Sequence, residues 1–204
     1  VRIDLERETQ KKVSVAITDF VLKDSMADIM GIGKEAKKIL EKDLRLSEWF
    51  SPLSRQVFEE LEEMERSSSE LDYRSWRQVG AQWLIKTEYS VMKNGKGQVF
   101  IFRLYDAVNK RFLFGKRYKA SSDLFRKTVH RFADEVVMQL TGKRGIAETQ
   151  IAFLGQEKSG KEIYLIDFDG HNLRQLTFDH TINLSPAWSP DSKWIIYTSY
   201  AARN

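Results

Sequence analysis

The pattern of hydrophobic and polar residues divides the chain into a mixed α and β part and a following part made of strands. Val13, Val15 and Ile17 alternate with small residues, which is typical of a strand with one buried face. From Ser25 to Ser47 apolar residues recur every three or four positions, which predicts an amphipathic helix capped by Ser25. Its apolar positions are Ile29, Ile32, Ala36, Ile39, Leu40 and Leu44.

Three strand-like runs follow an acidic segment that ends at Glu70 and is expected to be loop or short helix. The runs cover residues 83–92, 98–107 and 111–119, and they are joined by segments rich in turn residues. We therefore expect an antiparallel meander. Its residues Phe100, Phe102 and Leu104 share one face.

A second helix is predicted to open at Ser122 or Asp123 and to end before Gly142, which suits the left-handed conformation past a helix end. Each apolar stripe must be buried against another element. We therefore expect an α+β domain in which two helices pack on one face of a mixed sheet of about five strands. The stripe of the second helix is Phe125, Val129, Phe132, Ala133, Val136 and Leu140.

Beyond Gly145 the pattern predicts strands only, at residues 150–155, 162–167 and 174–177. The segments "IAFLG" and "WIIYTS" are similar enough to be the same strand of two successive repeats, with Ile151 corresponding to Ile195. This spacing is a period of about 44 residues, which is in the range of a four-stranded propeller blade.

Composition indicates a globular protein, because 42% of the 204 residues are hydrophobic and 12% are aromatic. No window approaches the roughly 18 consecutive apolar residues of a membrane span, so no direct membrane insertion is expected. The absence of cysteine excludes disulfides and thiol catalysis, and it suits a periplasm as well as a cytosol. The first residues lack the pattern of a secretory signal, which indicates either a cytosolic protein or a signal already removed.

Net charge is +4, with an acidic run at residues 59–72 and a basic meander at residues 93–119. The aromatic residues interleaved in the meander would suit single-stranded nucleic acid. However, aromatics that alternate with charges are also what a half-buried sheet requires, so we interpret both runs as solvated faces and expect no nucleic-acid partner. The aromatic positions are Phe100, Phe102, Tyr105, Phe112, Phe114 and Tyr118.

Two glycine-rich segments match phosphate-binding patterns only in part. Residues 155–161 have the glycine and lysine spacing of a P-loop, but Glu162 replaces the magnesium-binding hydroxyl and the segment joins two strands. A hairpin turn is the preferred interpretation. Gly31 and Gly33 form a lone G-x-G, for which a close helix packing contact is preferred.

Other candidate chemistry is also weak. His130, His171 and His180 have no metal-ligand spacing, and residues 167–170 lack the remaining ligands of a calcium loop and suit a β-turn. No G-x-S-x-G motif occurs. We therefore expect no catalytic residue, no cofactor and no metal site.

The segment "LSPAWSPDSKWIIYTSY" resembles the repeat of TolB-type propellers. The segments "LTGKRGIAETQIAFL" and "IYLIDFDGHNLRQLT" resemble that family's domain junction and first blade, while "DLRLSEWFSPL" and "SWRQVGAQWLIKTEYSV" are similar to passages of its N-terminal domain. The resemblance implies a TolB-like N-terminal domain at residues 1–144. It also implies the first blade and the start of the second blade of a six-bladed propeller at residues 145–204, as in a piece of a longer protein.

Two positions depart from the family pattern, because Glu48 and Ser192 stand where the family usually has glycine. The first departure puts in doubt how the left-handed cap after the first helix is built. The second is expected to force either an uncomfortable φ or another turn type.

The resemblance implies a non-enzymatic periplasmic scaffold of the Tol-Pal system, with its signal peptide removed. In the family this system contributes to outer-membrane integrity, to envelope constriction at division and to bacteriocin import. The implied partners are the Pal lipoprotein, bound mainly through the propeller, and TolA, bound through Val1, Arg2, Ile3 and Asp4. From the sequence, these four residues could equally well be an ordinary first strand of the domain.

Two other functions remain open at this stage. One is a prolyl-oligopeptidase-like hydrolase with a gating propeller, and the other is a nucleic-acid module that uses residues 93–119.

Overall fold

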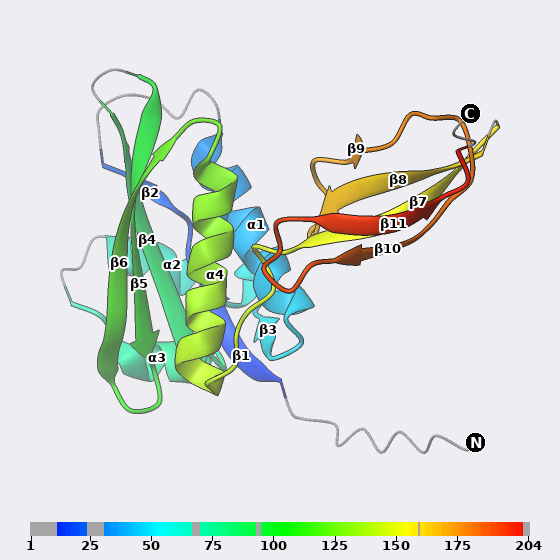
Figure 1. Cartoon of the computed structure of the whole chain (residues 1–204). Helices are drawn as coiled ribbons and strands as arrows, with labels where there is room; N and C mark the ends of the chain where they lie inside the picture. The colour runs from blue at the N-terminus through cyan, green and yellow to red at the C-terminus, as the bar shows by residue number, and fades with distance from the viewer. Residues whose placement is uncertain (1–11, 24–30, 67–69, 93–94, 159, 202–204) are drawn as a thin grey trace, which may run out of the picture. The chain divides into compact units, whose positions relative to one another are not determined.

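A computed structural model describes residues 12–23, 31–66, 70–92, 95–158 and 160–201 (Figure 1). The chain falls into two compact units that divide between Gly145 and Ile146. Each unit has its own sheets, and each is described by itself below.

The first unit is built on a mixed sheet of six described strands. These are β1 (Val13–Ile17), β2 (Val21–Leu22), β3 (Phe50–Pro52), β4 (Trp83–Val91), β5 (Gly97–Asp106) and β6 (Arg111–Ser121). β1 pairs in parallel with β3 and β4, and β4, β5 and β6 form the predicted antiparallel meander. The strand order is β3-β1-β4-β5-β6, with β2 also paired to β4, so β6 lies at one end of the described sheet.

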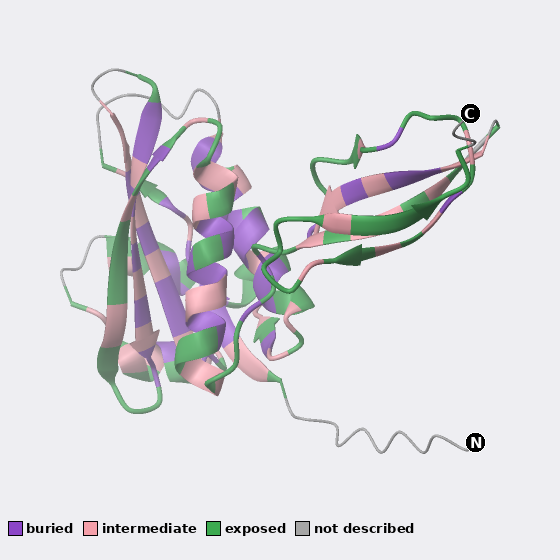
Figure 2. Cartoon of the chain, viewed as in Figure 1, coloured by how far each residue is buried: buried purple, intermediate pink, exposed green. Residues whose placement is uncertain are grey.

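Helices α1 (Ile32–Leu46) and α4 (Phe125–Thr141) cover one face of this sheet (Figure 1). Along β5 buried residues alternate with half-buried ones (Figure 2). Phe100, Phe102 and Leu104, which the sequence places on one face, are completely buried. The ring of Phe102 stacks on that of Phe132 of α4, with centroids 4.2 Å apart. The predicted apolar stripe of α4 is therefore the surface that closes this face of the core.

The other face of the sheet is also covered, which corrects the expectation that the helices lie on one face only. The 3₁₀ helix η1 (Arg55–Val57) and helices α2 (Glu59–Arg66) and α3 (Tyr73–Gln78) lie there. Phe58 and Trp76 pack against Ala16 of β1 and Leu84 of β4 in a second core cluster. The rings of Phe58 and Trp76 lie 5.5 Å apart. The central strands are consequently buried on both sides.

Both long helices begin later than the sequence predicts. α1 begins at Ile32 after Gly31, whose φ is 63°, and the expected cap Ser25 lies outside the described residues. α4 begins at Phe125 after Leu124, so neither Ser122 nor Asp123 is its cap. At the other end the prediction is confirmed, because Gly142 follows α4 with a φ of 70°.

The second unit contains only strands in its described part, in two small sheets. β7 (Gln150–Glu157), β8 (Gly160–Asp167) and β9 (Arg174–Gln175) form one antiparallel sheet. β10 (Asn183–Trp188) and β11 (Ile195–Ser199) form the other. The predicted strand over residues 174–177 is shorter than expected because the hydroxyl of Thr177 instead accepts a hydrogen bond from the backbone of Ile163.

Glu48 and Ser192 both adopt the left-handed conformation, with φ values of 65° and 57°. Of the two alternatives left open for Ser192, the structure therefore has the positive φ, and the left-handed conformation at Glu48 is adopted without glycine. Glu48 follows the last turn of α1, where its N–H donates to the carbonyl of Arg45 at 3.3 Å. Ser192 closes a turn by donating its N–H to the carbonyl of Ser189 at 2.9 Å. A residue with a Cβ is strained at both positions.

Replacing Glu48 by glycine is expected to stabilise the protein by about 1 kcal/mol, because glycine adopts a positive φ without the steric cost of a Cβ. Urea unfolding measures the change. Glu41→Gly, in the interior of α1, is the matched control and is expected to destabilise by about 1 kcal/mol. Equal losses of stability in the two variants would show that Glu48 is not strained.

Candidate functional site

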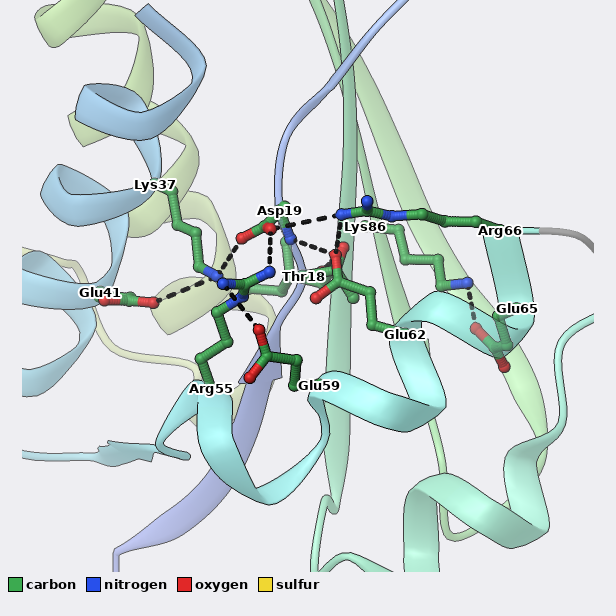
Figure 3. Close-up of polar contacts among 11 residues, drawn as sticks. Thr18, Asp19, Lys37, Glu41, Arg55, Glu59, Glu62, Glu65, Arg66 and Lys86 are labelled. Atoms are coloured by element: carbon green, nitrogen blue, oxygen red, sulfur yellow. Dashed lines mark hydrogen bonds and ion pairs between the residues drawn. The ribbon is translucent and has the colours of Figure 1, made fainter. Parts of the chain in front are cut away.

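The most extensive charged cluster in the first unit surrounds Asp19, just beyond the carboxyl end of β1 (Figure 3). Its carboxylate accepts a hydrogen bond from Lys37 Nζ of α1 at 2.7 Å. It also lies 3.0 Å from a guanidinium nitrogen of Arg55 and 3.4 Å from one of Arg66. One acid thus binds three basic side chains from three separate segments.

A second layer of contacts ties helix α2 to the same point. The backbone N–H of Asp19 donates to Glu62 at 2.7 Å, and Glu62 is buried within α2. Glu65 of the same helix contacts Lys86 of β4 and accepts a 2.7 Å hydrogen bond from the indole of Trp76. The acidic residues of α2 therefore fasten the helix to the sheet, which is a structural role for part of the acidic run.

The basic neighbours also determine the charge state of Asp19. Burial on its own would raise the pKa of Asp19, but the hydrogen bond and charge of Lys37, together with Arg55 and Arg66, outweigh burial and hold the pKa below its usual value. Asp19 is therefore ionised at neutral pH and acts as the centre of an ion-pair network. The arrangement fastens elements to one another, because the three basic side chains around Asp19 come from α1, η1 and α2.

A pocket of about 450 Å³ opens beside β3 and the end of α4. Its walls are Trp49, Trp83 and Leu140, and Lys143 Nζ lies 4.7 Å from the ring centroid of Trp49. The hydroxyl of Thr141 in its lining already donates to the carbonyl of Val137 at 2.7 Å. The pocket thus offers an apolar surface with one cation, that of Lys143, and one carboxylate, that of Glu48. Such a lining is better suited to binding an apolar side chain than to catalysing a reaction.

In the second unit, Glu162 of β8 is completely buried and forms hydrogen bonds that link the two small sheets. Its carboxylate accepts hydrogen bonds from the hydroxyl of Thr177 at 2.5 Å, from the backbone of His180 at 2.8 Å and from Asn183 at 3.2 Å. The preceding segment is the β7–β8 hairpin, in which Glu157 pairs with Gly160. The hairpin interpretation is confirmed, and Glu162 is a structural residue.

The remaining partial motifs also have structural explanations. A Cβ on Gly33 would lie 2.8 Å from the ring of Tyr89, so this glycine permits the predicted close packing of α1 on the sheet. Gly170 closes the predicted β-turn with a 2.8 Å hydrogen bond to the carbonyl of Asp167. Within the described residues no group of three or more potential ligands is placed to hold a metal ion, and no helix is long and apolar enough to cross a membrane.

The aromatic residues of the basic meander are mostly unavailable for base stacking. Phe100 and Phe102 are fully buried, and Phe114 and Tyr118 are half-buried against α4 and its neighbours. Phe112 is the exposed exception. A stacking platform needs several accessible rings in succession, so this geometry does not favour the nucleic-acid alternative.

The proposed TolA-binding residues Val1, Arg2, Ile3 and Asp4 lie outside the described residues. Sequence reasoning did not single out Asp19 or the pocket residues Trp49 and Trp83, and it considered Glu162 only as a departure from the P-loop pattern. The position of Asp19 directly after a buried strand could have marked it as a candidate. Its partners could not have been identified in this way, because they come from segments up to 47 positions away.

A model of the TolB amino-terminal domain matches residues 1–113. The chain belongs to the TolB family. Two relatives named "Tol-Pal system protein TolB" illustrate the relationship. The protein of Desulfosudis oleivorans is 35% identical over 192 residues, which cover 93% of this chain and 43% of the relative. That of Geobacter sulfurreducens is 35% identical over 167 residues, which cover 82% of this chain and 38% of the relative.

The fold agrees with this family. The crystal structure of TolB from Acinetobacter baumannii superposes with a TM-score of 0.74 at 19% identity, and the match covers 94% of this chain and 45% of that structure. At this identity the likeness shows the fold alone. The chain spans less than half the length of these relatives.

The variant Asp19→Asn is expected to destabilise the protein by about 1–3 kcal/mol at pH 7, because it leaves buried Lys37 without its closest counter-charge. Since the folded pKa of Asp19 is depressed, its ionic stabilisation is present above the unfolded pKa and is lost as pH falls through the lower folded value. The stability difference between wild type and variant should therefore shrink below about pH 4. Urea unfolding at a series of pH values measures it.

Glu63→Gln is the matched control for this variant, because Glu63 is an exposed acid on α2. It should change stability by less than about 0.5 kcal/mol at any of these pH values. A stability difference for Asp19→Asn that does not change with pH would contradict the network as described.

Proposed function

We propose that this protein is a non-enzymatic, periplasmic interaction scaffold of the Tol-Pal system. Family membership carries this proposal, because the TolB amino-terminal model matches residues 1–113 and the relatives are named as Tol-Pal system proteins. In this role it would contribute to outer-membrane integrity, to envelope constriction at division and to the uptake of bacteriocins.

The polar clusters of the described residues support a scaffold. Asp19 connects three segments of the first unit, and Glu162 connects the two sheets of the second. In both cases the charged side chain is used to fix one element against another. Such an arrangement gives a rigid surface for partners, and we assign no catalytic residue, cofactor or metal.

We propose residues 1–144 as the TolB-like N-terminal domain and residues 145–204 as the first propeller blade with the start of the second. β7, β8 and β9 would belong to the first blade, and β10 and β11 to the second. Large apolar side chains that remain exposed support this assignment, because a blade buries its faces only against neighbouring blades. They include Ile151, Leu154, Trp194, Ile196 and Tyr197.

The proposed partners are the Pal lipoprotein and TolA. Pal would bind mainly to the propeller, of which this chain holds a small part. TolA would bind Val1, Arg2, Ile3 and Asp4, whose apolar residues alternate with charged ones. Such a segment can add as a strand to an exposed sheet edge.

Removal of residues 1–4 is expected to weaken binding of TolA from the same organism by at least about 10-fold, because the added strand is lost. Calorimetric titration measures the affinity. The unfolding temperature should not change, since the buried core of the described residues begins at Val15.

A second variant, Val1→Ser with Ile3→Ser, keeps the length and the charges of the tail and removes only its apolar side chains. It should also lose affinity for TolA if apolar contacts specify the strand. Undiminished TolA binding by the deletion variant would rule out this tail as the site.

A further inference from the structure

Among the described strands of the first unit, β6 lies at one end of the sheet and has one long edge without a paired strand. It runs from Arg111 to Ser121 and pairs only with β5 in the described sheet. Most of its residues are exposed, and Figure 2 shows the strand as a largely green ribbon. Exposed edges are usually shortened, bent by bulges, interrupted by proline or protected by charged side chains. Between Phe114 and Ser121 the pairing with β5 has a regular register, and this stretch contains no proline.

The ladder determines which backbone groups of β6 point outward. Hydrogen-bonded and non-hydrogen-bonded pairs alternate along an antiparallel ladder. The N–H of Ser122 donates to the carbonyl of Lys96, which fixes the phase of this alternation. Gly115, Arg117 and Lys119 are therefore at non-hydrogen-bonded positions, and their N–H and C=O groups face away from β5. These groups form a template for another strand.

The side chains along this edge carry one sign of charge. Arg117 and Lys119 are exposed, lie two residues apart on the same face and have no ion-pair partner among the described residues. Their neighbours differ in this respect, because Lys116 lies 3.1 Å from Glu135 of α4 and Arg103 lies 3.2 Å from Glu88. The unmatched positive charge is thus concentrated at the outward-facing positions of the edge strand.

An apolar contact point lies at the beginning of the same strand. The ring of Phe112 is 53% exposed and packs 5.5 Å from that of Tyr105, which in turn lies 6.4 Å from that of Tyr73. A Cβ on Gly115 would lie 3.3 Å from the Phe112 ring, so the glycine leaves room for it. An incoming strand would therefore meet an aromatic surface at one end and two cations further along.

From these features we propose that the β6 edge binds an extended, acidic segment of a partner protein by strand addition. Main-chain hydrogen bonds to Gly115, Arg117 and Lys119 supply the pairing. Acidic side chains at alternate positions of the segment lie opposite Arg117 and Lys119, where opposite charges stabilise cross-strand pairs. An apolar residue of the segment contacts Phe112. This surface is distinct from the TolA and Pal sites proposed above.

The test uses the whole chain and a capped heptapeptide in which Glu alternates with Thr and Val. Fluorescence anisotropy of the labelled peptide at low salt is expected to show saturable binding. The double variant Arg117→Glu/Lys119→Glu should weaken binding by at least about 10-fold, since two attractive cross-strand pairs become repulsive. Amide exchange at Gly115, Arg117 and Lys119 should slow when the wild-type protein binds the peptide.

Two controls test whether binding depends on the position of the two cations and on backbone hydrogen bonds, rather than on net charge alone. Lys38→Glu/Lys127→Glu makes the same change in net charge at exposed positions of α1 and α4, and it should bind the peptide as the wild type does. A peptide N-methylated at every residue keeps its charges but has no backbone N–H to donate at either edge, and it should bind at least about 10-fold more weakly.

Four outcomes would overturn the proposal. They are no binding of the acidic peptide, equal binding of the N-methylated peptide, equal binding of a matched peptide with Lys in place of Glu, and binding of a single-stranded oligonucleotide in preference to the peptide. TolA binding by the Arg117→Glu/Lys119→Glu variant is measured in parallel and should be unchanged. A failure at the β6 edge is therefore distinguishable from a failure of the proposed function.

Discussion

Burial of β1 on both faces is the constraint on which the first unit depends. Val15, Ala16 and Ile17 are consecutive and almost completely inaccessible. Since neighbouring residues of a strand point to opposite faces, a run of this kind requires cover on both sides of the sheet. α1 and α4 cover one face, and η1, α2 and α3 cover the other. The small side chain of Ala16 lets Phe58 and Trp76 approach the strand.

The second covering layer is attached by charge as well as by apolar contact. α2 buries only Leu61 and Glu62, which is little apolar surface for a helix. Its position is specified by the contacts of Glu62 with Asp19 and of Glu65 with Lys86. A partly buried ion pair adds limited net stability because desolvation opposes it, but removing one partner is costly. The network therefore contributes more to the position of the helix than to the total stability.

The sequence predicted the elements whose pattern is local. The meander, the apolar stripe of α4 and the left-handed Gly142 all follow from periodicity or from one residue's backbone freedom. The single-face interpretation of the sheet failed because β1 was read as a strand with one buried face, whereas Ala16 on its second face is also buried, at 0% exposure. Small residues on the second face of a strand look alike whether solvent or a helix covers them.

Helix starts and polar clusters were not predictable for a related reason. The start of α1 is set by Gly31 in a left-handed conformation, without a side-chain cap that a pattern could reveal. Asp19 and Glu162 each depend on partners from other segments, so their roles appear only when the chain is folded. Glu48 and Ser192 are a different case, because the resemblance drew attention to both positions but left their backbone conformation open, and the structure shows a positive φ at each.

The two units leave different kinds of sheet surface exposed, and the difference bears on how each is used. β11 in the second unit exposes Ile196 and Tyr197, and the preceding Trp194 is 69% exposed. Apolar surfaces of this kind are typical of permanent contacts within a fold or an obligate assembly. The β6 edge of the first unit instead combines cations with one aromatic ring. Charged surfaces favour fast, salt-sensitive and reversible association. Under the proposals above, the first unit would therefore bind partners reversibly, whereas the exposed apolar side chains of the second would contact neighbouring blades.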